Sequence, residues 1–307
     1  MSVQPGESRA LRQTGLPIII LGADRSGISL VAELVSCWGA WGGEAGDLAR
    51  ADRWNPRGYF QHRAMAAFLV ELTAGTGLNP WHPEFPRRCR EQAENLELRG
   101  KAEHLVDAMA GSGRVWFWKE PKLSALLPFW QPVWGEAVYI IALRNPYDSA
   151  RSLERMKIPA ELRERTSLLG ANLLFWQHSM HDILTGTEGV SRKIFISYED
   201  LLRAPREECR RLSAFLDEEG RTLGGEDRSE RMAAIVRPEL QNHKSSRPFE
   251  EVEEATRSQK DLYEFLLAKR ENPEAPYVAA RYPIYPGGAN TWTRCISSPG
   301  STTRPGH

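Results

Sequence analysis

Cysteine, net charge and long apolar runs are all scarce in this sequence. Its 307 residues contain four cysteines, with no CxxC pair and no nearby histidine at metal-ligand spacing: Cys37, Cys89, Cys209 and Cys295. That scatter predicts reduced thiols, with neither a disulfide nor a metal site, as in a cytoplasmic protein.

Forty basic and forty acidic residues cancel, so no overall electrostatic field draws the chain to nucleic acid or to an anionic membrane. Any anion-binding site must therefore be local.

No segment of the sequence is a candidate membrane span. The first apolar run, Leu16–Leu21, is far shorter than the core of a signal peptide. No later segment approaches the ~20 uninterrupted apolar residues that a bilayer crossing needs. At the same time, 41% of the residues are hydrophobic, which is enough for a sizeable core. The composition therefore predicts a folded protein without a membrane span.

Short apolar runs rich in β-branched and aromatic residues predict strands that are buried on both faces. These runs are Pro17–Leu21, Arg114–Trp118, Ala137–Leu143 and Lys193–Ser197. Between and after them, apolar residues recur at helical spacing, in Leu30–Leu34, Leu162–Ile183 and Arg206–Leu216. Strands that alternate with helices predict an α/β fold of three layers, in which helices flank a mostly parallel sheet.

The predicted organisation is a single domain over residues 16–270. The first two predicted strands are too far apart in the sequence for one crossover helix, so residues 38–113 are expected to form an insertion over the active-site end of the sheet. Helices are expected within it at His62–Thr73 and Pro86–Ala110. Residues 271–307 are rich in proline and glycine and show no periodic pattern, which predicts an extended tail.

The first predicted strand runs directly into a turn that has the features of an anion site. The turn is Gly22-Ala23-Asp24-Arg25-Ser26-Gly27-Ile28-Ser29, and a helix-like segment follows it. Backbone N–H groups at the start of such a helix point at a bound anion. Gly22 and Gly27 let the backbone approach an oxygen closely, Ser26 and Ser29 add hydroxyl donors, and Arg25 adds a positive charge. The alternative reading is a structural turn without a ligand.

Position 28 separates this turn from the P-loop of nucleoside triphosphatases. The pattern GxxxxGK[ST] requires lysine there, and this chain has Ile28. That lysine and the Mg²⁺-binding hydroxyl serve a triphosphate. An arginine inside the turn and no lysine after it favour a smaller, metal-free phosphosulfate ligand.

A second candidate anion site follows the third predicted strand. Arg144 stands at the carboxyl end of this strand, and Ser152 follows on the next predicted helix, which starts near Pro146. Arginine offers a planar fork of donors and the helix start offers N–H groups and a favourable dipole. The pattern predicts that Arg144 and Ser152 converge on one phosphate. The alternative is a surface arginine and an unrelated serine.

A third segment, Ser197–Leu202, follows the fourth predicted strand. Together with Arg25-Ser26-Gly27 and the segment Arg144–Ser152, it resembles the three donor-binding signatures of the sulfotransferase family. The donor of that family is 3′-phosphoadenosine 5′-phosphosulfate (PAPS). Two more segments, Asn55–Phe60 and Trp118–Lys122, are similar to segments of its bacterial and Golgi-type members. The resemblance implies a P-loop-like sulfotransferase fold.

The resemblance extends over residues 17–216 and implies a role for each signature. It assigns the 5′-phosphosulfate of PAPS to the turn after the first strand, at Arg25, Ser26, Gly27, Ile28 and Ser29. It assigns the 3′-phosphate to Arg144 and Ser152, and it implies that Tyr198 lies near the adenosine. A segment in the place where relatives often close a loop over the nucleotide, Arg237–Lys244, does not match residue by residue.

Sulfuryl transfer needs positive charge on the sulfonate and often a base for the acceptor proton. Lys119 is the candidate charge stabiliser and the candidate acid for the departing phosphate, because it ends the second predicted strand at the same edge as the turn Gly22–Ser29, called the phosphate turn below. The base is less obvious, since Gln61 stands where relatives commonly have glutamate and glutamine accepts no proton at neutral pH. His62 is the first candidate base and Glu120 the second. An amine or an acidic phenol would need no base.

The function expected from the resemblance is transfer of a sulfuryl group from PAPS to a hydroxyl or amine of a small-molecule, sugar or lipid acceptor. The nucleotide product is 3′-phosphoadenosine 5′-phosphate, and no metal, nucleic acid or membrane span is expected to take part. Trp41, Trp54 and Trp81 in the insertion are candidates to line an acceptor pocket, whereas Trp116 and Trp118 are expected in the core. The alternatives are a P-loop kinase or nucleotide hydrolase, and a nucleotide-binding homologue with impaired catalysis.

Overall fold

Four parallel strands form the centre of the protein in the computed structural model, which describes residues 16–52, 57–78, 84–92, 94–154, 167–219, 228–237 and 247–284. They are β1 (Ile18–Leu21), β2 (Phe117–Lys119), β3 (Val138–Leu143) and β4 (Lys193–Ser197). Their order in the sheet is β2-β1-β3-β4. In register, Ile18 of β1 is opposite Phe117 of β2 and Val138 of β3, and Tyr139 of β3 is opposite Lys193 of β4.

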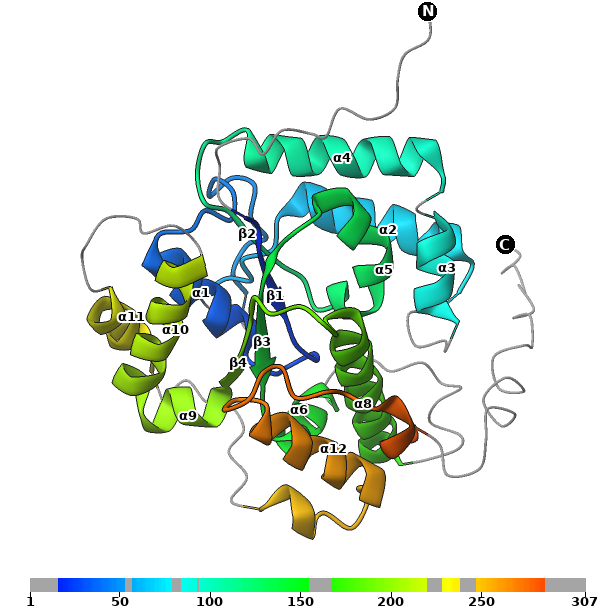
Figure 1. The fold of residues 1–307 in the computed structure, drawn as a ribbon, viewed down its shortest axis with the longest axis vertical. Helices are drawn as coiled ribbons and strands as arrows, with labels where there is room; N and C mark the ends of the chain where they lie inside the picture. Colours follow the sequence, from blue (N-terminus) through cyan, green and yellow to red (C-terminus); the bar gives the residue numbers. More distant parts are fainter. Residues whose placement is uncertain are drawn as a thin grey trace, which may run out of the picture.

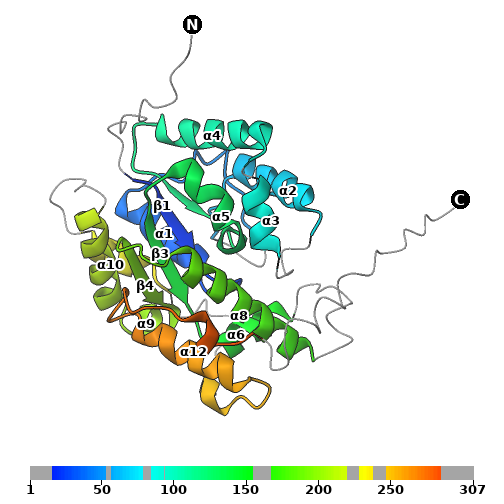
Figure 2. The same cartoon turned by 45° about the vertical axis from the view of Figure 1, so that its right-hand side comes forward.

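Helices cover both faces of this sheet (Figure 1). They are α1 (Ile28–Trp38), α2 (Arg63–Thr76), α3 (Phe85–Gln92), α4 (Leu96–Ala110), α5 (Leu123–Trp134), α6 (Pro146–Leu153), α8 (Leu168–Gly186), α9 (Tyr198–Arg203), α10 (Pro205–Glu219), α11 (Ser229–Ile235) and α12 (Arg257–Ala268). Helices α1, α10 and α11 lie on one face and α5 and α8 on the other, with α2, α3 and α4 outside α5 (Figure 2). The predicted three-layer α/β fold is confirmed.

Successive strand residues are buried in two different cores. Ile18 and Ile20 of β1 pack with α1, α10 and α11, whereas Ile19 and Leu21 pack with α5 and α8. All four are fully buried. Side chains alternate between the two faces of a strand, so a sheet covered on both faces needs an apolar residue at every position. This is why the strands were recognisable as continuous apolar runs.

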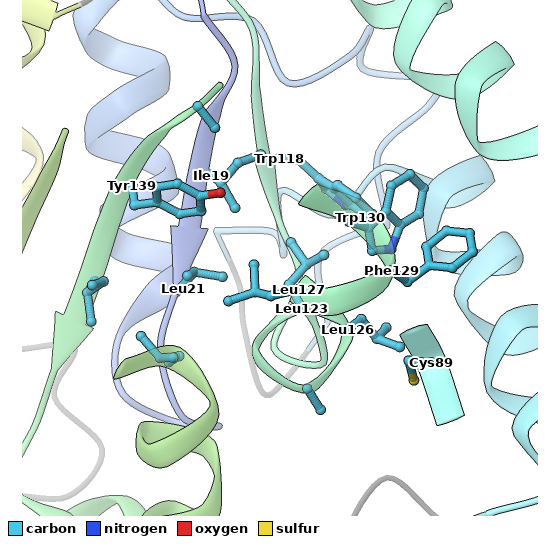
Figure 3. Packing of buried hydrophobic residues seen from close by; sticks show 14 of the residues in the cluster. Ile19, Leu21, Cys89, Trp118, Leu123, Leu126, Leu127, Phe129, Trp130 and Tyr139 are labelled. Atoms are coloured by element: carbon cyan, nitrogen blue, oxygen red, sulfur yellow. The ribbon is translucent and has the colours of Figure 1, made fainter. Parts of the chain in front are cut away.

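The core on the α5 face is rich in aromatic rings (Figure 3). Trp118 from β2 and Trp130 from α5 meet edge to face, with ring centroids 4.5 Å apart, an arrangement that aromatic quadrupoles favour. Trp130 also stacks on Trp134 at 5.8 Å. Trp116 and Trp118 are both almost fully buried, as expected from the sequence.

The second predicted strand and the last predicted helix of the insertion differ from the observed elements. Strand β2 spans Phe117–Lys119 and does not begin at Arg114; Trp116, just before it, forms a parallel bridge with Trp41 from the start of the insertion. The single helix predicted over Pro86–Ala110 is two helices, α3 and α4. The side chain of Asn95 accepts hydrogen bonds from the backbone of residues 97 and 98, and thereby caps the start of α4.

The chain after α12 returns to the body of the protein as far as residue 284. The buried ammonium of Lys269 donates to the carbonyls of Pro273 and Ala275 at 2.8 and 2.6 Å. Tyr277 is 6% exposed and its ring packs beside His181 of α8. The rest of the predicted tail, residues 285–307, lies outside the described residues. Among the residues with described positions, no helix combines the length and apolar character needed to cross a membrane.

Candidate functional site

The carboxyl ends of the parallel strands lie at one edge of the sheet, and each is followed by residues singled out in the sequence. After β1 the chain enters α1 on one face, and after β3 it enters α6 on the other side, where α6 packs on α8. Adjacent strands whose connections leave in opposite directions open a crevice between their carboxyl ends. The candidate site is at this edge.

The turn after β1 has a conformation adapted to the start of a helix. Gly27 is the N-cap of α1 and has a φ of 90°, and Arg25 also has a positive φ of 66°. The backbone N–H of Ser26 donates to the carbonyl of Ala23 at 3.1 Å. The Ser26 hydroxyl is buried and has no hydrogen-bond partner among the described residues. A buried donor without a partner beside a helix start fits a ligand that supplies acceptor oxygens.

Close packing explains why position 27 is glycine. A Cβ atom on Gly27 would lie 2.5 Å from Cδ2 of Tyr198, whose ring comes from the start of α9. Real Cβ atoms do not approach a ring carbon this closely, and the positive φ of Gly27 would strain any other residue as well. The ring of Tyr198 therefore lies directly against the phosphate turn.

Hydrogen bonds join the phosphate turn to the second candidate anion site. Arg25 Nε donates to Ser152 Oγ at 2.9 Å, and Arg144 Nη1 donates to the backbone carbonyl of Arg25 at 2.9 Å. The guanidinium carbon of Arg144 lies 4.8 Å from the centre of the Tyr198 ring, within the range of a cation–π contact. The structure thus brings together Arg25, Arg144, Ser152 and Tyr198, which come from three segments of the chain.

Helix α6 starts where the sequence predicted it. Pro146 occupies its first turn, and the Asn145 side chain caps it by accepting a hydrogen bond from the backbone N–H of Tyr147 at 2.9 Å. The backbone N–H of Asn145 is held by Glu199 Oε1 at 2.9 Å. These contacts fix the end of β3 against the start of α9, and Arg144 and Ser152 are both buried at this junction.

Lys119 and Glu120 form a second group of charges at the end of β2. The Lys119 ammonium lies 6.0 Å from the centre of the Tyr59 ring, which belongs to the insertion. Gln61 Nε2 donates to Glu120 Oε2 at 2.7 Å. Burial lowers the pKa of Lys119 to about 8, although the nearby Glu120 and Asp24 oppose this shift. Burial also raises the pKa of Glu120, although Lys119 and the hydrogen bond from Gln61 oppose that shift.

Asp24 also belongs to this group, although its position in the turn had not marked it as a candidate site residue. Its carboxyl is half-buried in the phosphate turn and within electrostatic reach of Lys119 and Glu120. Burial raises its pKa to about 6, and Glu120 adds to that shift. A carboxyl inside a turn suited to anions is itself a signal in the sequence, because its charge opposes the ligand's charge.

His62 points in another direction from Gln61. Its ring packs against Gly43, and the charges that act on it are those of Asp47 and Arg63. Burial lowers the pKa of His62, and its Nδ1 is buried without a hydrogen-bond partner among the described residues. The described contacts therefore associate Gln61 with Glu120 and place His62 beside the loop that precedes α2.

Arg57 anchors the insertion to α1 and to the end of α11. This residue donates to the carbonyl of Ile235 at 2.5 Å and forms an ion pair with Glu33 of α1. Among the tryptophans proposed for an acceptor pocket, Trp41 is half-buried and its indole N–H donates to Glu44 at 3.2 Å. Trp54 and Trp81 lie outside the described residues, as does most of the segment Arg237–Lys244.

The described cysteines, Cys37, Cys89 and Cys209, are free thiols, and Cys295 lies outside the described residues. Burial raises the pKa of the Cys89 and Cys209 thiols to about 12, so both stay protonated at neutral pH. Within the described part of the chain, no group of three or more histidine, cysteine, aspartate or glutamate side chains is placed to hold a metal ion.

Three solved structures are similar to the chain at low sequence identity. A sulfotransferase domain from the curacin biosynthetic pathway is 16% identical, with a TM-score of 0.48 over 84% of this chain and 98% of that chain. A sulfotransferase domain from the Synechococcus PCC 7002 olefin synthase is 19% identical, with a TM-score of 0.45 over 86% and 98%. The sulfotransferase STF9 from Mycobacterium avium is 15% identical, with a TM-score of 0.44 over 87% and 79%.

No curated protein matches the chain in sequence. By contrast, the family model described as "Sulfotransferase family" matches residues 17–221, which is more than half of the chain. The matched range includes the phosphate turn, the end of β2, the segment from Arg144 to Ser152 and the start of α9. The chain therefore belongs to the sulfotransferase family.

Proposed function

We propose that this protein transfers a sulfuryl group from PAPS to a hydroxyl or amine of a small-molecule, sugar or lipid acceptor. The observation that carries the proposal is the pair of hydrogen bonds that Arg25 makes, to Ser152 through its side chain and to Arg144 through its carbonyl. They place two cationic donor groups side by side at the carboxyl edge of the sheet. PAPS requires two such groups, because it carries anionic groups on both the 3′ and the 5′ side of one ribose.

The donor-binding residues follow from this arrangement. The turn residues Arg25, Ser26, Gly27, Ile28 and Ser29 are proposed to hold the 5′-phosphosulfate, with the partnerless Ser26 hydroxyl as one donor. Arg144 and Ser152 are proposed to hold the 3′-phosphate. Tyr198, which lies against Gly27 and under Arg144, is proposed to border the adenosine.

PAPS supplies the activated sulfuryl group. The acceptor oxygen or nitrogen forms the new bond to sulfur, and the bond between sulfur and the bridging phosphate oxygen breaks. The electron pair of the broken bond leaves with 3′-phosphoadenosine 5′-phosphate, and the acceptor loses its proton. Lys119 is proposed to stabilise the negative charge that develops on the sulfonate and on the leaving phosphate, because it is buried beside the end of β1, where the turn begins.

We assign the role of base to Glu120 in preference to His62. Glu120 follows Lys119 directly, and its carboxylate is oriented by the 2.7 Å hydrogen bond from Gln61. The raised pKa of this buried carboxyl makes it a stronger base than an exposed glutamate. Gln61 then acts as a positioning residue for the Glu120 carboxylate. This role accounts for a glutamine at the position where relatives commonly carry glutamate.

Donor binding is the first test of the proposed function. A thermal shift is expected with PAPS and with 3′-phosphoadenosine 5′-phosphate, and no shift is expected with ATP and Mg²⁺. Arg144→Ala should weaken PAPS binding at least about tenfold, because hydrogen bonds to charged groups are worth about 1.5–3 kcal/mol. Arg231→Ala is the matched control, since Arg231 is an exposed arginine of α11 whose side chain reaches the carbonyl of Cys37.

The second test is turnover. Incubation with PAPS across a panel of phenols, alcohols, amines and sugars should release 3′-phosphoadenosine 5′-phosphate with at least one acceptor, in the absence of added metal. A stabilising response to ATP and Mg²⁺ and none to PAPS would contradict the proposal and favour a P-loop kinase or hydrolase. PAPS binding without turnover on any acceptor would point to the impaired homologue.

A further inference from the structure

Asp24 places a carboxyl inside a turn that is suited to bind an anion. It lies between Ala23, which is almost fully buried, and Arg25, whose side chain and carbonyl are both engaged in the site. Within the described residues the Asp24 carboxyl itself makes no hydrogen bond and no ion pair, although it is half-buried. An unpaired carboxylate at such a place opposes the binding of an anionic donor.

None of the cationic groups near Asp24 forms an ion pair with it among the described residues. On its own turn, Arg25 donates to Ser152. At the end of β2, Lys119 lies over the ring of Tyr59, and Lys122 follows in the next segment. Each of the three lies within electrostatic reach of Asp24 without forming an ion pair with it.

The acidic neighbour of Asp24 is better placed to keep its negative charge. Glu120 accepts a hydrogen bond from Gln61 at 2.7 Å and a longer one from the backbone N–H of Lys122 at 3.5 Å. Hydrogen bonds to a carboxylate favour its charged form. Asp24 is therefore protonated more readily than Glu120.

We propose that Asp24 takes up one proton from solvent when PAPS binds, and that the protonated carboxyl then donates a hydrogen bond to an oxygen of the phosphosulfate. The proton returns to solvent when 3′-phosphoadenosine 5′-phosphate leaves, so the cycle is balanced. This inference rests on the proposed function, because it assumes that PAPS occupies the turn. Asp24 thus becomes a donor-binding residue whose protonation depends on pH.

The titration of Asp24 is consistent with this role. Burial raises its pKa to about 6, Glu120 raises it further, and Lys119, Arg25 and Lys122 oppose the shift. At pH 7.5 the carboxyl is therefore mostly ionised in the free protein. The negative charge of bound PAPS raises the pKa again, so binding draws a proton from solvent.

Calorimetric titration of PAPS at pH 7.5, in buffers that differ in protonation enthalpy, measures the protons taken up on binding. The wild type is expected to take up close to one more proton per PAPS than Asp24→Asn. The 3′-phosphate of PAPS titrates in both proteins, so its contribution cancels in this difference. Asp24→Ala, which also lacks the titrating group, repeats the comparison with a smaller side chain.

The pH dependence of PAPS affinity provides a second readout. Wild-type affinity is expected to fall by up to about tenfold per pH unit above pH 6, and the affinity of Asp24→Asn is expected to change less. Asp47→Asn, which removes a carboxyl beside His62, serves as the control and should behave as the wild type.

Two outcomes separate this inference from the proposed function. Suppose that the wild type binds PAPS, and that both variants, Asp24→Asn and Asp24→Ala, take up as many protons on binding as the wild type does. The inference is then wrong and the proposed function stands. If the wild type binds no PAPS in any buffer, the proposed function is wrong and the inference falls with it.

Discussion

Arg25 Nε donates a hydrogen bond to Ser152 Oγ at 2.9 Å and thereby connects the turn after β1 with the helix after β3. The two residues are 127 positions apart in the sequence. Arg144, at the end of β3, donates to the carbonyl of the same Arg25. The two proposed anion sites therefore share one residue, and a change on one side should be felt on the other.

Ser152→Ala should weaken PAPS binding about tenfold. The variant removes a donor proposed for the 3′-phosphate and also releases the side chain of Arg25, and each hydrogen bond is worth about 0.5–1.5 kcal/mol or more when charged. Calorimetry on Ser152→Ala, Arg25→Ala and the double variant should give non-additive losses, because the two residues are in contact. Ser213→Ala, a buried serine of α10 that bonds Asp217, is the matched control. Strictly additive losses would contradict the shared role.

Gly27→Ala should abolish measurable PAPS binding and lower the melting temperature. The new Cβ would lie 2.5 Å from the Tyr198 ring, and alanine at a φ of 90° costs about 1–2 kcal/mol in addition. Gly189→Ala separates the two effects, because Gly189 has a φ of 71° and no atom within 4 Å of an added Cβ. Gly189→Ala should lose some stability and keep its PAPS affinity. Equal PAPS affinities for the two variants would show that the contact with Tyr198 is unimportant.

Glu120→Gln should lower kcat by about 10²–10⁴ without weakening PAPS binding, as expected when a base is lost. His62→Ala, by comparison, should leave kcat within a few-fold of the wild type. The reverse ranking would assign the base to His62.

Gln61→Ala tests the positioning role of the glutamine. Burial raises the pKa of Glu120 and the hydrogen bond from Gln61 lowers it, so the loss of that bond raises the pKa further. The acidic limb of the kcat profile should therefore move to higher pH. An unchanged limb with a reduced kcat would indicate that Gln61 has a structural role only.

Activity should fall as the pH rises through about 8. Burial lowers the pKa of Lys119 to about 8 in the free protein, so its ammonium is charged below this pH and neutral above it. The profile of kcat/KM for PAPS reports groups of the free enzyme, so it should show this basic limb at about pH 8, in addition to the fall that Asp24 causes above pH 6. Lys119→Arg keeps its charge and should lose the limb, whereas Lys119→Met should lose about 10²–10³ in kcat. A limb that persists in Lys119→Arg would belong to another group.

Asp24→Asn should stabilise the protein at pH 7.5 and not at pH 4. Burial raises the pKa of Asp24 in the folded protein to about 6, above its ordinary value of 3.8. Its contribution to stability is therefore present below pH 4 and is lost as the pH rises through 6. Melting curves of the wild type and the variant across this range should diverge as the pH increases. Parallel curves would mean that Asp24 has an ordinary pKa.

Most of the sheet could be predicted because its strands are buried on both faces. At Ile18–Leu21 and Val138–Leu143 every residue is buried, so the apolar runs coincide with the strands. At β2 the coincidence fails, since the strand begins at Phe117 and extends beyond the apolar run to the buried, charged Lys119. The break between α3 and α4 was missed for a local reason, because the helical spacing continues past the capping Asn95.

The sequence by itself determined the local chemistry of this protein. Four features are local patterns that can be read from the sequence: a buried strand before Gly22, a helix after Gly27, an arginine at the end of β3 and a lysine at the end of β2. Parallel strands bring their carboxyl ends to one edge of the sheet, so these features are expected to lie together. The family could be recognised from these patterns. Asp24 stood in the same turn, and its carboxyl was present in the sequence as a signal.

The tertiary structure alone decided which of these groups meet. Arg25 bonds Ser152, and Gln61 turns to Glu120 while its neighbour His62 turns to Gly43. The unusual titration of Asp24 likewise depends on burial and on Glu120, which β2 brings close. Hydrogen bonds and charge interactions act over a few ångströms between residues far apart in the chain, so their partners are set by packing and not by sequence spacing.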